Sequence, residues 1–169
     1  EKRVMELAFS ADGQFLAARF DSEEAPVLIW DVETGEQIAE IHSEGVNFLE
    51  ALDIAFHPQE PWLAIAYSEH VLLWDLQQHD TLGKLTLQEP QEIFSVLAFH
   101  PNGKVLATGG ADGFARWELE TFEAIALPNE ANATSGNTSY LAYDPSGNWL
   151  VSGGLTLYDA ETGDEIGSI

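Results

Sequence analysis

The feature that most constrains this chain is a strand-and-turn phrase that occurs four times. Its clearest copy runs from Ala98 to Glu118, with apolar runs on either side of Asn102-Gly103 and a second turn before Trp117. An Asn-Gly pair enters the positive-φ region with little strain, so between alternating apolar runs it indicates a hairpin. The phrase therefore predicts three antiparallel strands in succession.

Two sets of marker residues show that the phrase is a tandem repeat. The aromatic residues before the first turn, spaced 47, 43 and 44 residues apart, are Phe9, Phe56, Phe99 and Tyr143. The markers that end the third strand, spaced 44, 43 and 41 residues apart, are Trp30, Trp74, Trp117 and Tyr158. Because two independent markers keep one period, we expect a repeat fold.

Each repeat predicts four strands, here named a to d. The units span about 3–41, 48–87, 93–127 and 138–169, and together they form one domain over 1–169. No long stretch has helical periodicity, so we expect almost no helix. The residue before each first marker is alanine in all four units, which favours strands packed radially around a crowded axis.

The charge of the chain excludes several classes of partner. Six Lys and Arg against 29 Asp and Glu give a net charge of −23. Binding to nucleic acid requires clustered basic residues, and so does binding to an anionic membrane surface, so neither is expected. A basic protein or a cation would be attracted, although the acidity could equally serve solubility alone. The chain has no cysteine, which excludes disulfides, a thiolate nucleophile and a cysteine-based zinc site.

Three turns carry a recognisable family pattern. The segments 8–13, 98–103 and 142–147 read AFSADG, AFHPNG and AYDPSG, and each precedes an apolar strand that ends in Trp-Asp or a variant of it. These phrases resemble those of the WD-repeat β-propeller family. The resemblance implies an all-β propeller with four-stranded antiparallel blades, four per chain, that acts as a non-catalytic scaffold for protein interactions.

The chain departs from the family pattern in two ways. No unit has the Gly-His dipeptide before strand a, and the turn aspartate is present only as Asp112, with Glu69 in its place in the second unit. The family's buried hydrogen-bond network is therefore expected to be incomplete. Four blades could close as a small ring, belong to a larger propeller, or pair with a second copy as an eight-bladed homodimer.

Several residues could suggest chemistry, but each has a simpler structural interpretation. His57 and His100 could form a metal site, although equivalent turn residues on separate blades would lie too far apart. No segment places a nucleophile beside a base, so we expect no enzyme and no cofactor. An enzyme using Glu6 and Asp53 near the axis is the alternative from another class. Trp30, Trp74 and Trp117 are expected in the core, with Trp62 and Trp149 partly exposed.

The family resemblance places the b–c and d–a loops on one face, and loops on a rigid scaffold often carry recognition. The acidic residues expected on that face are Asp21, Glu23, Glu24, Glu44, Glu69, Glu89, Glu92, Asp112 and Glu130. We therefore expect a cytoplasmic scaffold whose acidic face binds a protein or peptide. Charge complementarity predicts that this partner is basic. The alternative is a structural, sensor or oligomerisation module from a larger WD-repeat protein.

Overall fold

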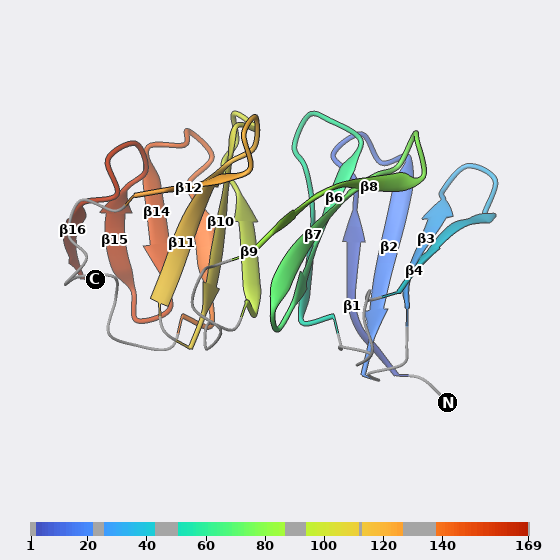
Figure 1. Ribbon diagram of the computed structural model, residues 1–169, viewed down its shortest axis with the longest axis horizontal. Coiled ribbons are helices and arrows are strands. Elements are labelled where there is room, and N and C mark those ends of the chain that lie inside the picture. The colour runs from blue at the N-terminus through green and yellow to red at the C-terminus, as the bar shows by residue number, and fades with distance from the viewer. Residues whose placement is uncertain are drawn as a thin grey trace.

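The computed structural model describes residues 3–21, 26–42, 51–86, 94–111, 113–126 and 138–168. In these ranges the chain forms only strands and turns, arranged as four separate four-stranded antiparallel sheets (Figure 1). Within each sheet the strands follow chain order, so each sheet is a meander. The predicted all-β fold of four-stranded blades is confirmed. None of the described residues forms a helix long and apolar enough to cross a membrane.

The four sheets are called blades 1 to 4. Blade 1 contains β1 (Val4–Phe9), β2 (Phe15–Phe20), β3 (Val27–Asp31) and β4 (Gln37–Ile41). Blade 2 contains β5 (Asp53–Phe56), β6 (Trp62–Tyr67), β7 (His70–Asp75) and β8 (Asp80–Leu85). Blade 3 contains β9 (Val96–Phe99), β10 (Val105–Gly110), β11 (Gly113–Glu118) and β12 (Glu123–Ile125). Blade 4 contains β13 (Leu141–Tyr143), β14 (Trp149–Ser152), β15 (Thr156–Asp159) and β16 (Glu165–Ser168).

The last strand of blade 2 begins at Asp80, directly after a tight turn. One carboxylate oxygen of Asp75 accepts hydrogen bonds from the backbone N–H groups of Gln77 and Gln78, at 2.7 and 2.8 Å. An aspartate that caps its own turn shortens the connection, so pairing with β7 resumes at once.

Apolar faces of neighbouring blades form the core. One cluster joins Ala17 and Ile29 of blade 1 to Leu63 and Leu72 of blade 2, and equivalent clusters join blades 2 and 3 and blades 3 and 4. The innermost strands β1, β5, β9 and β13 contact one another in that order. Blades 1 and 4 lie at opposite ends of the row in Figure 1, so the four blades do not close into a ring by themselves.

The two ends of the row expose apolar surface that is buried elsewhere. Leu7 of blade 1 is 60% exposed, whereas the equivalent Ile54 and Leu97 are 4% and 7% exposed. Among the residues that the structure describes, the exposed large apolar residues belong to the first and last blades: Val4, Met5, Leu7, Phe9, Val32, Tyr140, Trp149, Leu155 and Ile166. Both outer sheets therefore present faces of the kind that pack together inside the row.

The buried tryptophan network is incomplete, as the sequence predicts. The indole N–H of Trp117 donates to the hydroxyl of Thr108 at 2.8 Å. The indole N–H of Trp74 is buried without a partner, because Ile65 occupies the equivalent position and has no acceptor. An unpaired buried donor costs about 1–3 kcal/mol, so hydrophobic packing must stabilise blade 2 against this loss.

Two histidines connect neighbouring blades, an arrangement called here the His–Gly latch. Nε2 of His57 lies 2.7 Å from the carbonyl oxygen of Gly103, and Nε2 of His100 lies 2.8 Å from that of Gly147. Nδ1 of His57 accepts from the backbone N–H groups of Gln59 and Glu60, which requires Nε2 to be the donor toward Gly103. The interpretation of the two histidines as separate turn residues agrees with this arrangement.

The latch requires glycine opposite the histidine. Gly103 has φ of +72°, and a Cβ added there would lie 2.5 Å from Cε1 of His57. Gly13, in the equivalent turn of blade 1, has φ of +73°, but a Cβ there would meet nothing within 4 Å. The two glycines thus share one backbone conformation and differ only in their surroundings.

This difference gives a matched pair of variants. Gly13→Ala should cost only the strain of a left-handed alanine, about 1–2 kcal/mol. Gly103→Ala should lower the unfolding free energy by at least about 1 kcal/mol more, because the new methyl group displaces His57 and breaks its hydrogen bonds. Urea denaturation followed by tryptophan fluorescence measures both. Equal losses in the two variants would show that the latch does not contribute to stability.

Candidate functional site

Two of the predicted binding residues lie within the described part of the chain. Asp21 accepts a hydrogen bond from the backbone N–H of Arg3 at 2.9 Å, and its carboxylate lies 3.7 Å from Nε of Arg3. Glu69 is exposed in the turn between β6 and β7. These two residues belong to different blades. The others lie outside the described residues: Glu23, Glu24, Glu44, Glu89, Glu92, Asp112 and Glu130.

The innermost strands hold a coupled pair of carboxyl groups. Glu6 of β1 accepts from Nε of Arg19 at 2.7 Å, and the side chain of Asp53 on β5 hydrogen-bonds with that of Glu6. Asp53 also accepts from the backbone N–H of Leu97 at 2.6 Å, which connects the pair to blade 3. Burial, and then the charge of Glu6, raise the pKa of Asp53 to about 7. The sequence places both carboxyl groups near the axis, and the structure shows that they link three blades.

A second set of features lies at the end of the blades opposite to the loops that carry Asp21 and Glu69. This end is called here the a–b end. It carries the a–b and c–d turns, whereas the other end carries the b–c and d–a loops. A groove opens there at each of the three blade junctions. The cavity volumes are about 400 Å³ between blades 1 and 2, 350 Å³ between blades 2 and 3, and 710 Å³ between blades 3 and 4.

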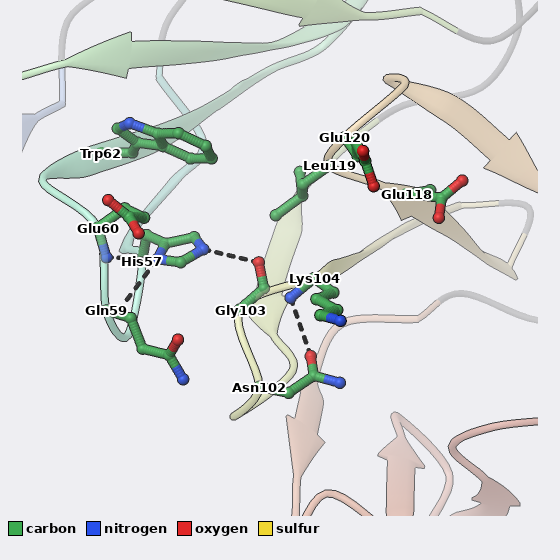
Figure 2. Close-up of a pocket in the computed structure, with 10 residues that line it drawn as sticks. All are labelled: His57, Gln59, Glu60, Trp62, Asn102, Gly103, Lys104, Glu118, Leu119 and Glu120. Carbon is green, nitrogen blue, oxygen red and sulfur yellow. Dashed lines mark hydrogen bonds between the residues drawn. The ribbon is translucent and has the colours of Figure 1, made fainter.

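The groove between blades 2 and 3 is called the indole groove, after Trp62. It is lined by His57, Gln59, Glu60 and Trp62 of blade 2 and by Asn102, Gly103, Lys104, Glu118, Leu119 and Glu120 of blade 3. Figure 2 shows Trp62 on one side of the cavity, with Leu119 and Glu120 on the other. An apolar and aromatic surface rimmed by carboxylates can hold a cationic side chain with an aliphatic stem.

The groove between blades 3 and 4 has different chemistry, because Arg116 lines it. This residue is 2% exposed, and its guanidinium donates to the carbonyl oxygens of Ala160 and Thr162 at 2.8 and 3.2 Å. Its Nε and the hydroxyl of Tyr143 are buried without hydrogen-bond partners. A buried cation at this junction disfavours a second cation, so the indole groove and this groove are not equivalent.

Sequence reasoning did not find the grooves, although part of the signal is visible. Trp62 and Trp149 are expected to be partly exposed, and each lines a groove, Trp62 between blades 2 and 3 and Trp149 between blades 3 and 4. The two histidines of the latch occupy one turn position in successive units, and its two glycines occupy another. What the sequence does not show is that the latch of one blade and the c–d turn of the next lie around a single cavity. Among the described residues, no group of three or more acidic or histidine side chains could hold a metal ion.

Comparisons with known proteins agree with this architecture. Residues 84–117 match the model of the WD domain, G-beta repeat. WD repeat-containing protein WRAP73 of Mus musculus is 33% identical over 129 residues, which cover 73% of this chain and 26% of that protein. Echinoderm microtubule-associated protein-like 1 of Mus musculus is 29% identical over 104 residues, covering 59% and 12%. Small ribosomal subunit protein RACK1y of Oryza sativa is 24% identical over 130 residues, covering 73% and 37%.

These similarities and the four-stranded blades define a repeat protein of the propeller class. The chain belongs to the WD-repeat family. Members of this family generally act as protein-interaction scaffolds. The chain spans between 12% and 37% of the length of the three relatives named.

The carboxyl pair predicts an unusual dependence of stability on pH. Because folding raises the pKa of Asp53 from 3.8 to about 7, its stabilising effect is complete below pH 3.8 and is lost as the pH rises through about 7. Asp53→Asn resembles the protonated acid, so it should be more stable than the wild type at pH 8 by at least about 1 kcal/mol. Urea midpoints between pH 5 and pH 8 test this.

Asp31→Asn is the control for that experiment. Asp31 is partly exposed, and hydrogen bonds from the backbone and side chain of Thr34 lower its pKa. Its contribution to stability is therefore present at high pH and lost as the pH falls, which is opposite to Asp53. The decline above pH 5 should persist in Asp31→Asn and disappear in Asp53→Asn. A decline that survives in Asp53→Asn would contradict the assignment.

Proposed function

We propose that this chain is a non-catalytic scaffold whose acidic surface binds a basic segment of a partner protein in the cytoplasm. In this proposal residues 1–169 form one WD-repeat propeller or part-propeller. The observation that carries it is the net charge of −23 on a fold whose family generally binds proteins. The acidic residues predicted for the b–c and d–a loops remain candidates for the binding face.

The distribution of the carboxylates supports binding of a basic partner. In the c–d turns, Glu33, Glu120 and Glu161 occupy equivalent positions in blades 1, 3 and 4. Three ion pairs occur within the described residues, and none involves these three glutamates. Carboxylates that form no ion pair create a negative potential that steers basic segments toward the surface.

The test is a binding titration with two peptides of about fifteen residues, one rich in lysine and arginine and the other with glutamate at the same positions. The basic peptide should bind, with affinity falling at least about tenfold between 50 and 500 mM salt, because screening weakens contacts between exposed charges. The acidic peptide should not bind. If neither peptide binds at low salt, or both bind equally, the proposed function is wrong.

A second candidate function is that of an oligomerisation module, and the exposed faces of blades 1 and 4 favour it. We propose that the exposed face of blade 1, with Leu7 and Phe9, packs against the exposed face of blade 4 from a second copy, with Trp149 and Ile166. The argument is continuity: this contact would repeat the junction that joins blades three times within the chain. Two copies paired in this way form an eight-bladed ring.

The solution mass tests this second candidate. Light scattering should give about twice 18.5 kDa for the wild type. Phe9→Glu should give a monomer, because it places a charge in the apolar contact, whereas Ala11→Glu adds the same charge to an exposed turn and should leave the dimer intact. A folded wild-type monomer would overturn the candidate.

A further inference from the structure

We propose that the indole groove between blades 2 and 3 is a subsite for an arginine side chain of the basic partner. This inference rests on the proposed function and specifies where and how a basic segment is recognised. It places recognition at the a–b end, opposite to the loops that the sequence analysis favours.

The shape of the groove fits one long side chain. Its volume of about 350 Å³ lies near the lower end of the range for ligand sites. Trp62 at the start of β6 and Leu119 from the c–d turn of blade 3 provide apolar surface on opposite sides (Figure 2). An aliphatic stem can lie along such surfaces while its charged end meets the carboxylates at the rim.

Most neutral polar side chains of the groove already have hydrogen-bond partners in the backbone. His57 uses both ring nitrogens in the latch and in its own turn, and the side-chain oxygen of Asn102 accepts from the backbone N–H of Lys104. These groups therefore have little remaining capacity to bind a neutral ligand.

The carboxylates are the groups left available. Within the described ranges, the side chains of Glu60 and Glu120 have no hydrogen bond or ion pair, and Glu118 accepts only from the hydroxyl of Thr121, at 3.3 Å. Lys104 forms no ion pair with a described carboxylate, and in Figure 2 it lies on the side of the groove away from Trp62. The groove thus offers acceptors to a cation that enters from solution.

Arginine fits this combination better than lysine. Its planar guanidinium stacks on an indole face and presents a fork of donors to carboxylates, whereas an ammonium group is a compact and strongly hydrated charge. A groove with an indole on one side and glutamates on the other offers partners for both properties of the guanidinium.

The other two grooves differ from this arrangement. Between blades 1 and 2, Phe15 replaces the indole and Gln77 stands where the indole groove has Glu120. Between blades 3 and 4, Val105 stands at the position of Trp62, and although Trp149 and Glu161 line the other side, the buried Arg116 places a poorly screened positive charge there. Among the three grooves, the one between blades 2 and 3 is therefore the best suited to arginine.

The test compares three single carboxylate substitutions that change the net charge equally. Glu120→Gln alters the groove. Glu33→Gln alters the equivalent c–d turn of blade 1, and Glu33 lines none of the three grooves described. Glu69→Gln alters the opposite end, on the face predicted from sequence. The probe is an arginine–glycine repeat peptide at about 150 mM salt, with lysine–glycine and citrulline–glycine versions for comparison.

The expected results are specific to the groove. Glu120→Gln should weaken binding of the arginine peptide at least about fivefold, and Glu33→Gln and Glu69→Gln less than about twofold. Trp62→Leu should reduce the preference for arginine over lysine, and the citrulline peptide should not bind to any variant. Circular dichroism confirms that each variant is folded before its binding is compared.

Two outcomes would overturn the proposal, and they can be told apart. Equal losses in Glu120→Gln and Glu33→Gln would show diffuse attraction, which rejects the groove and leaves the acidic scaffold intact. A largest loss in Glu69→Gln would likewise reject the groove and favour the loop face. Failure of the wild type to bind either cationic peptide would reject the scaffold function together with the groove.

Discussion

The contact between the apolar face of one blade and the opposing face of the next is the interaction on which this structure depends. A single four-stranded meander buries little apolar surface, because nothing within one sheet covers its faces. Residues such as Ile29 and Leu72 become fully buried only where two blades meet. The same requirement explains the outer blades, where Leu7 and Phe9 occupy positions that are covered in blades 2 and 3.

Polar connections between blades depend on this packing and do not replace it. Blade 3 gives Trp117 a threonine partner, whereas blade 2 leaves the indole N–H of Trp74 unpaired and is still the most completely buried of the four. The His–Gly latch constrains how two blades are spaced, because the histidine ring can hydrogen-bond to the next turn only at one separation of the blades. The packing therefore provides most of the stability, and the polar contacts determine the spacing.

The repeat made the fold predictable, since two markers with one period fix where strands begin and end. Turn residues such as Asn102-Gly103 carried that information locally. The grooves could not be predicted in the same way, because each depends on the distance between turns more than 40 residues apart in sequence, as for His57 and Gly103. Nor could the raised pKa of Asp53, which depends on the approach of Glu6 from another blade. Local chemistry is visible in a sequence, whereas contacts between repeats depend on their packing.

The indole groove follows from the same geometry as the latch. Where His57 holds the turn of Gly103 at hydrogen-bond distance, the c–d turn of blade 3 is brought opposite Trp62, so the cavity and the latch share residues. The latch uses both ring nitrogens of His57, whereas among the described residues the glutamates at the rim form no ion pair. The contact that sets the spacing of two blades therefore also shapes a surface rimmed by carboxylates, and this is the basis on which a basic partner is proposed.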